Sequence, residues 1–206
     1  MSAVEKSEPA VTTPAIGQAY GGGFITGITC DPATGKRSLH ITAGAAHELV
    51  GKWGEYGVKI EGADSFTDSL ANTQAMAAAG SELASKVLAL SVGGYNDWAI
   101  PARDVQELQY RHFKPTTEEN WESSRNGDNP HSEPVGQLYS AEDPLQTVHA
   151  AFQEGGAEAF RDTWYWSSSQ RSAYYAFLMY FGDGGQYDSV KYRERRVRPV
   201  RSEFID

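Results

Sequence analysis

The clearest pattern of hydrophobic and polar residues in the chain has the period of a helix. Residues 69–90, SLANTQAMAAAGSELASKVLAL, place most of their apolar side chains near one face of a helix. Asp68 or Ser69 suits the start of this helix as a capping residue. Gly80 and Ser81 lie inside the pattern and favour an interruption there. The pattern therefore predicts a helix that is broken near its middle.

Two further helices are predicted downstream. One begins at Pro101, a favourable first-turn residue, and turns Val105 and Leu108 inward while Asp104 and Glu107 face water. The other spans 144–155 and ends at a glycine pair. Between them lies a polar insert, residues 116–136, and a loop of that length in a compact domain is usually functional or mobile.

Strand-like segments lie at both ends of the chain. Residues 17–28 and 37–43 flank the turn DPATGK and predict a hairpin. Beyond Trp164, residues 173–181 and 186–192 form a second hairpin through Asp183-Gly184-Gly185, and 196–200 form a last strand with Pro199 at an edge or a bulge. With the helices between them, and with the N- and C-terminal strands pairing, these segments predict an α+β domain with a mixed or antiparallel sheet, two to three helices and long loops.

Two kinds of residue alternate between positions 165 and 201. The first kind is typical of a core and comprises Trp166, Ala173, Ala176, Phe177, Phe181, Gly184, Val197 and Val200. The second kind is typical of a surface that is free to vary and comprises Arg171, Tyr174, Tyr175, Leu178, Tyr180, Asp183, Tyr187, Asp188, Ser189, Tyr192 and Arg193. Tyrosine gives a large contact area at low entropic cost, and small polar residues give adaptable hydrogen bonding. We interpret the second set as a ligand-binding face on a rigid scaffold.

Length and charge narrow the function classes. A chain of 206 residues suits one domain, 17–206, preceded by a flexible tail or linker, 1–16. The net charge of −9 argues against a nucleic-acid partner, which needs a basic face. We expect the arginines of the last forty residues to cover strands at the sheet surface. No apolar run reaches membrane-spanning length and the start lacks a signal-peptide core, so we expect a cytoplasmic protein at synthesis without membrane insertion.

The residues that carry chemistry are scattered. Five histidines lack ligand or triad spacing, so we expect no zinc, no cofactor and no catalytic residues. Cys30 is the single cysteine and suits a small buried apolar position. Asn126, Asp128 and Asn129 offer oxygens for calcium, but a plain loop explains them better. Four tryptophans suit the core, whereas Trp121 in the polar insert is the candidate for an exposed aromatic.

Two segments resemble a known family. DWAIPARDVQELQYRHFKP (97–115) is similar to the pattern D-W-R-L-P-T-R-x-E-L-x-x-L-Y in the C-terminal domain of collagen-like bacterial adhesins. The segment from Tyr165, YWSSSQRSAYYAFLMYFGDGGQ, with the ending RVRPVR, resembles the W-S-S-T…R-V-R-P-V-R end of the same domain. Ala99, Ala102 and Phe177 depart from these patterns conservatively. The resemblance covers roughly the last hundred residues.

This resemblance implies a C-type lectin-like fold. Domains of this kind occur in phage and prophage tail-associated proteins and as variable proteins of diversity-generating retroelements, which rewrite adenines in a C-terminal repeat, commonly in AAC codons. Such changes reach every residue type in the variable set above, but not Met, Gln, Lys, Glu or Trp. The unreachable residues in this region fall mostly where the family pattern is fixed, and they are Gln170, Met179, Gln186, Lys191 and Glu194.

Two binding functions, one structural function and one catalytic function follow as hypotheses. The favoured one is recognition of a protein or cell-surface ligand by a diversified face, on a homo-oligomer or a multi-copy particle such as a virion. The alternatives are a structural tail or assembly domain and a calcium-dependent carbohydrate-binding lectin. The same fold also supports oxidases that act on a sulfatase cysteine, but that chemistry needs a reactive cysteine pair, and Cys30 has no partner. We therefore expect a protein that is not an enzyme.

Overall fold

The computed structural model describes residues 15–123 and 125–205, so most of the predicted tail, residues 1–14, lies outside the described part. Within that part, the three α-helices are α1 (Ser69–Ala78), α2 (Glu82–Leu88) and α3 (Arg103–Phe113), and the 3-10 turns are η1 (Ala45–His47) and η2 (Ala150–Phe152). The strands are β1 (Ala19–Tyr20), β2 (Gly23–Cys30), β3 (Arg37–Thr42), β4 (Leu49–Lys52), β5 (Ser132–Glu133), β6 (Trp164–Gln170), β7 (Tyr175–Tyr180), β8 (Gln186–Val190), β9 (Glu194–Val197) and β10 (Val200–Ile205).

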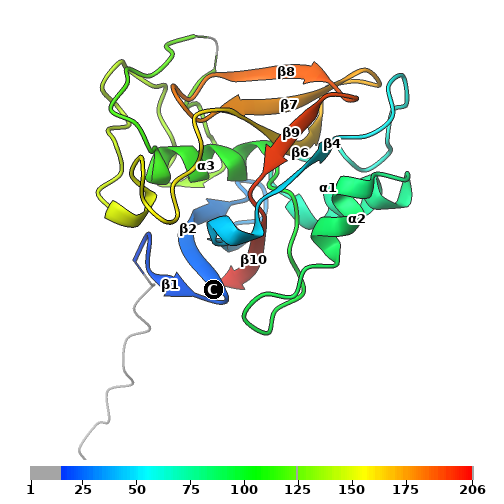
Figure 1. Ribbon diagram of the computed structural model, residues 1–206, viewed down its shortest axis with the longest axis horizontal. Helices are drawn as coiled ribbons and strands as arrows, with labels where there is room; N and C mark the ends of the chain where they lie inside the picture. The colour runs from blue at the N-terminus through cyan, green and yellow to red at the C-terminus, as the bar shows by residue number, and fades with distance from the viewer. Residues whose placement is uncertain (1–14, 124, 206) are drawn as a thin grey trace, which may run out of the picture.

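The strands form two sheets. Sheet A has the order β1-β2-β3-β10, with β5 added to β2, and sheet B has the order β4-β9-β6-β7-β8. Figure 1 shows sheet B above and sheet A below, with α3 between them and with α1 and α2 beside them. The α+β class predicted from the sequence is confirmed, and the mixed pairing comes from one parallel contact, between β6 and β9.

The ends of the described chain meet in sheet A. The predicted hairpin exists as β2 and β3, which pair antiparallel, and β10 pairs along the other side of β3. Ile16 already packs against the hydrophobic core, so the folded domain begins slightly before residue 17. Cys30 ends β2 and is only half-buried, which corrects the expectation of a buried position.

The predicted last strand, 196–200, is wrong in one informative way. The segment RVRPVR belongs to two strands, because β9 ends at Val197 in sheet B and β10 starts at Val200 in sheet A. Arg198 and Pro199 form the crossing between the sheets. Pro199 has no N–H to donate, and its carbonyl accepts a hydrogen bond from Ala43 N at 2.8 Å. Pro199 therefore lies between two strands, and not at the edge or bulge of a single strand as predicted.

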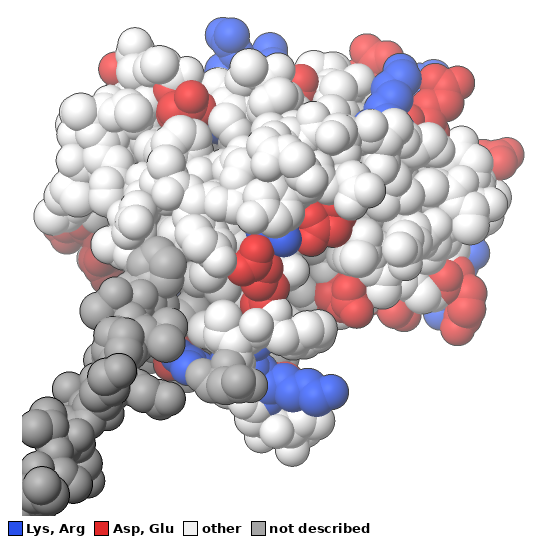
Figure 2. All heavy atoms as spheres, turned by 90° about the horizontal axis from the view of Figure 1, so that it is seen from below, with Lys and Arg blue, Asp and Glu red and all other residues white. Residues whose placement is uncertain are grey.

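The arginines of the last forty residues were predicted to lie at the sheet surface, and this is wrong for two of them. Arg198 is fully buried and pairs with Glu48 at 2.7 Å, and its guanidinium stacks on the Phe160 ring at 4.3 Å. Arg201 is buried against Asp97, with Nε 2.8 Å from Oδ1. Buried charges need such partners, because an unpaired one carries a large desolvation cost. On the face seen in Figure 2, the exposed basic and acidic side chains are intermixed.

The first helical pattern is confirmed as two helices. Asp68 caps α1 by accepting from Ala71 N at 2.9 Å, and Ser81 caps α2 by accepting from Ala84 N at 3.4 Å. The third predicted helix, 144–155, is wrong, because its only helical turn is η2. Long-range contacts replace it, since Lys114 Nζ donates to the Pro144 carbonyl at 3.2 Å.

The polar insert covers the side of α3 that was predicted to face water. Asp104 is buried, and its two oxygens contact Arg125 Nη2 at 2.9 Å and His131 Nδ1 at 2.7 Å. Arg125 and His131 both belong to the insert. The prediction that Asp104 lies on a solvated helix face is therefore wrong.

Glu107 is the second buried carboxylate of α3, and it too corrects the predicted wet face. Oε1 accepts from Arg111 Nε at 2.8 Å and from Tyr139 OH at 2.9 Å, while Oε2 accepts from Asn129 Nδ2 at 2.7 Å. Burial raises the pKa of Glu107 above its ordinary value. The helix thus carries two acidic anchors that hold the insert in one conformation.

Truncation of the core should separate scaffold residues from surface residues. Trp166 and Phe181 are fully buried, so replacing either by Ala should lower the free energy of unfolding by about 3–5 kcal/mol. Tyr174→Ala at an exposed position is the control and should change it by less than about 0.5 kcal/mol. Thermal and denaturant melts measure both, and equal losses would contradict the division.

Acid should destabilise the fold through His40. The ring is buried between Thr29 Oγ1 at 2.7 Å and Ser202 Oγ at 2.9 Å, and burial lowers the pKa of His40 from 6.5 to about 4. The unfolded chain binds the proton more readily than the folded chain does. The contribution of neutral His40 to the free energy of unfolding is therefore complete above pH 6.5 and is lost as the pH falls towards 4. The loss should reach roughly 3 kcal/mol.

The variant His40→Gln should unfold with a flatter pH dependence between pH 6.5 and 4 than the parent chain. The half-buried His47 provides the matched control, His47→Gln. Urea melts at a series of pH values measure the difference. An identical acid dependence of the parent and His40→Gln would exclude His40 as the source.

Candidate functional site

The main concavity over sheet B is a groove of about 580 Å³ that contains most of the predicted ligand-binding positions. We call it the C-terminal groove. Six of its residues were predicted from the sequence, namely Leu178, Tyr180, Asp183, Tyr187, Asp188 and Ser189. Three others complete it, namely Trp121, Trp164 and Arg195. Its volume falls in the range of small-molecule sites, roughly 300–1,000 Å³.

Strand register brings the aromatic side chains together. Trp164 lies opposite Tyr180, and Leu178 lies opposite Tyr187. Because residues two apart on a strand share a face, these four side chains lie on the same side of the sheet. The Trp164 ring lies 5.0 Å from that of Tyr180 and 5.6 Å from that of Tyr187. The result is an aromatic wall above an aliphatic floor.

The turn between β7 and β8 is the predicted one. Gly184 has a φ of +77° and is buried against the rings of Tyr110 and Tyr139. A side chain there would collide with Tyr110 and would strain the backbone, so glycine is required. This turn fixes the register that places Tyr187 beside Leu178.

The polar insert supplies the opposite wall. Trp121 is about half exposed and donates its backbone N–H to the Asp183 carbonyl at 2.8 Å. Asn126 holds the same turn from both sides, because its amide donates to the Trp121 carbonyl at 2.6 Å and its oxygen accepts from Gln186 N at 3.0 Å. The insert and the C-terminal sheet therefore build one site together.

Acidic and basic groups line the groove side by side. Asp183 accepts from Gly185 N at 2.9 Å, and burial raises the pKa of this carboxyl. Asp188 pairs with Arg171. Within the described residues the Arg195 side chain forms no ion pair, and its only hydrogen bond runs from Nη1 to the Glu194 carbonyl at 2.9 Å. The groove thus offers both hydrogen-bond acceptors and an uncommitted guanidinium.

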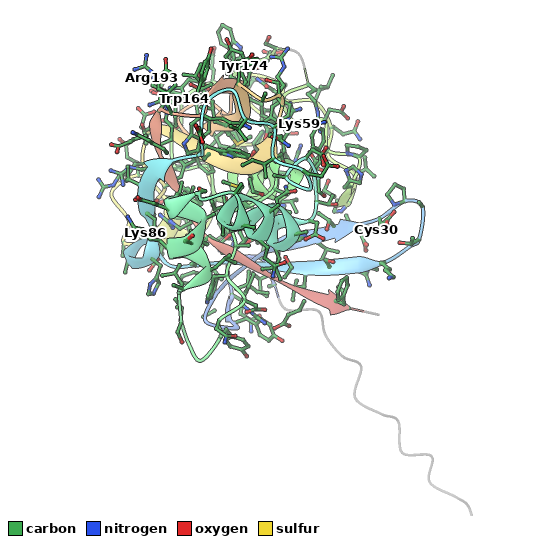
Figure 3. All side chains as sticks on the ribbon, turned by 90° about the vertical axis from the view of Figure 1, so that its right-hand side faces the viewer. Cys30, Lys59, Lys86, Trp164, Tyr174 and Arg193 are labelled. Atoms are coloured by element: carbon green, nitrogen blue, oxygen red, sulfur yellow. The ribbon has the colours of Figure 1, made fainter. Side chains whose placement is uncertain are left out.

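A second exposed cluster consists of Tyr56, Tyr174 and Tyr192. The ring of Tyr56 lies 5.0 Å from that of Tyr174 and 5.5 Å from that of Tyr192, and the guanidinium of Arg193 lies 5.8 Å from the Tyr192 ring. Figure 3 shows Trp164, Tyr174 and Arg193 at one end of the molecule, with Cys30 away from them near the β2–β3 hairpin. This tyrosine cluster and the C-terminal groove share that end.

A buried lysine supports the tyrosine cluster. Lys191 Nζ donates to the Val58 carbonyl at 2.8 Å and to Gln170 Oε1 at 3.0 Å, and it lies 4.4 Å from the Trp53 ring centre. Its backbone N–H also donates to the Tyr174 carbonyl at 3.1 Å. Burial lowers the pKa of Lys191 to about 8. These contacts tie the loop after β4 beneath the cluster.

Most predicted positions have the expected exposure. Tyr174, Tyr175, Tyr187 and Tyr192 are exposed, and so are Arg171 and Arg193. Leu178 is buried at 4% exposure, because Trp166 and Ala176 share its core cluster, so it is a floor residue and not a free one. Tyr180 is half-buried because its ring packs on Trp164.

Three contributors were missed in the sequence, namely Tyr56, Trp164 and Arg195. Trp164 was assigned to the core although it is only half-buried. Arg195 was assigned to the sheet surface, and it too is half-buried. The register of the hairpin at 183–185 was the available signal for Trp164, because that register places it opposite Tyr180. Tyr56 is more than a hundred residues away in sequence and gave no local signal.

The oxygens considered for calcium are taken up by the fold. Asn129 Oδ1 accepts from Ser132 N at 3.1 Å, and Asn126 Oδ1 accepts from Gln186 N at 3.0 Å. In residues 15–123 and 125–205, no group of three or more His, Cys, Asp or Glu side chains is arranged to hold a metal ion. No helix in the same ranges is long and apolar enough to cross a membrane.

In comparisons with known proteins, the chain matches no family model and no curated protein.

Loss of Asn126 should release Trp121. Asn126→Ala removes the donor to the Trp121 carbonyl and the acceptor for Gln186 N, so the free energy of unfolding should fall by about 1–3 kcal/mol. The indole N–H signal of Trp121, assigned with Trp121→Phe, should shift or broaden in ¹⁵N NMR spectra. Asn96→Ala, at an exposed position, is the control. An unchanged Trp121 signal would contradict this role.

Proposed function

We propose that residues 17–206 form a C-type lectin-like ligand-binding domain whose C-terminal region, 165–201, is a diversified recognition surface. In this proposal the protein is a variable protein of a diversity-generating retroelement, associated with a phage or prophage tail, and its partner is a protein or cell-surface ligand. The observation that carries the proposal is the convergence of six variable-set positions in one groove while the scaffold residues Trp166, Ala176 and Phe181 are buried.

The burial of the intervening residues supports a division of labour. Trp166, Ala176 and Phe181 are fully buried, whereas Tyr174, Tyr187 and Tyr192 are 45–48% exposed. A surface position can change at a cost within about 0.5 kcal/mol, but a buried aromatic cannot. Variation of the exposed set is therefore compatible with one constant fold.

Codon accessibility supports the same division. Among the five residues that adenine changes in AAC codons cannot produce, Gln170, Met179 and Lys191 are buried. Such residues belong to the scaffold and have no reason to vary. Gln186 is half-buried and Glu194 is exposed, so these two mark fixed or differently encoded positions within the surface.

Display in several copies fits a surface of this kind. An exposed groove with a few aromatic anchors concentrates binding energy in those anchors. Presentation on an oligomer or a particle would raise the overall affinity through effective concentration without new contacts. A tail-associated assembly provides such an arrangement.

The gene itself tests this proposal. A repeat nearly identical to the segment that encodes 165–201 should lie nearby and differ only at adenines. Sequencing of populations should find variants at the codons for Tyr174, Tyr187 and Ser189, and none at those for Trp166 and Phe181. Equal variation at both sets, or no variation and no repeat, would overturn the proposal.

A pair of libraries tests the physical basis separately. Randomising Tyr174, Tyr187 and Ser189 should leave most members folded, whereas the matched library at Trp166, Ala176 and Phe181 should leave few. Protease resistance measures the folded fraction in each. Similar folded fractions would show that the surface is not the part free to change.

A further inference from the structure

We propose that the C-terminal groove binds a neutral sugar ring, in the absence of calcium, through its aromatic walls and its mixed polar rim. This inference rests on the proposed function, because it names the class of ligand for the same surface.

The aromatic walls provide stacking surfaces for the apolar face of a ring. Trp121 and Tyr187 are each about half exposed and line the groove from two separate elements, the polar insert and β8. Trp164 is packed between Tyr180 and Tyr187, so its ring is held in place before any ligand arrives. Preorganised aromatic groups lose little entropy on binding.

The charges of the groove favour a neutral ligand over a charged one. A cation would meet the uncommitted guanidinium of Arg195, and an anion would meet the carboxylate of Asp183. The charge of Asp188 is already balanced by Arg171. A singly charged ion is attracted by one of these two groups and repelled by the other, so the two effects offset each other and neither charge sign gains much from entering.

Hydroxyl groups match this rim because each one both donates and accepts a hydrogen bond. Asp183 has acceptor capacity beyond its contact with Gly185 N. Arg195 has donors beyond its bond to the Glu194 carbonyl, and Ser189 adds a hydroxyl. A neutral polyol can satisfy carboxylate and guanidinium at once, which no singly charged group can do.

Calcium is not needed for this mode of binding. Within the described residues no cluster of acidic and histidine side chains is arranged to hold a metal, and the amides of the insert are engaged by the fold. Recognition would depend on ring stacking and direct hydrogen bonds. A chelator therefore separates this site from a calcium-bridged one.

The test titrates the full chain with methyl glycosides of glucose, galactose, mannose and N-acetylglucosamine in the presence of EDTA. Indole N–H signals of Trp121 and Trp164 in ¹⁵N NMR spectra report on the groove. At least one glycoside should cause saturable shifts of both signals, with a dissociation constant on the order of 1 mM, because one ring engages few atoms. Absence of shifts with all four glycosides overturns the proposal.

Two variants locate the site. Tyr187→Ala and Trp121→Ala change exposed groove residues and should each weaken binding by about tenfold or more, as expected for an anchor. Tyr20→Ala changes an exposed tyrosine of β1 in sheet A, outside the groove, so it is the matched control and should bind as the parent does. Binding that survives both groove variants, or shifts that need calcium, would overturn the assignment.

The outcome is independent of the test of diversification. If no glycoside binds while the gene carries the adenine-specific repeat, the recognition surface stands and its ligand is not a neutral sugar. If a glycoside binds and the repeat is absent, the groove is a sugar site on a domain that does not vary.

Discussion

The buried ion pair between Arg198 and Glu48 is the constraint on which both sheets depend. Arg198 is located where the chain leaves β9 in sheet B and enters β10 in sheet A. Glu48 neutralises it from the start of β4, and the same carboxylate accepts from Tyr165 OH at 2.6 Å. Removing either partner would leave a buried charge unpaired, which typically costs several kcal/mol. Because Tyr165 precedes Trp166 and follows Trp164 in β6, this pair also fixes the strand that supports the aromatic wall of the groove.

The three consecutive serines of β6, Ser167 to Ser169, are a second constraint on the fold. Ser167 Oγ donates to the Phe177 carbonyl at 3.1 Å, and Ser168 Oγ accepts from Asn72 Nδ2 at 3.2 Å. Ser169 Oγ donates to the Ser65 carbonyl at 2.6 Å. Small hydroxyl residues fit here because the buried strand must join two loops through hydrogen bonds, and every unmet polar group would carry a desolvation cost. The motif that resembled a family signature is thus explained by packing.

Local signals in the sequence predicted local features well. The break near Gly80, both hairpins and the exposure of most of the tyrosines depend on short-range patterns, and these predictions are confirmed, whereas Tyr180 is half-buried. The failures involve contacts between distant segments. Asp104 and Glu107 have the pattern of a wet helix face and are buried because the insert, some twenty residues later, covers them. For the same reason the groove was only half predicted, since its sheet residues are neighbours in sequence whereas Trp121 reaches it through the fold.

The position of the proposed variable residues in sheet B explains why substitutions there should cost little stability. β8 is an edge strand that pairs with β7 alone, whereas β6 lies between β9 and β7. Tyr187 is exposed and contacts β6 through the half-buried ring of Trp164, so it can change without repacking the core, while the fully buried Trp166 cannot. An exposed edge invites unwanted pairing, and here the insert covers part of it through the contact between Asn126 and Gln186 N. The same insert contributes Trp121, so the element that protects the edge also builds the second wall of the C-terminal groove.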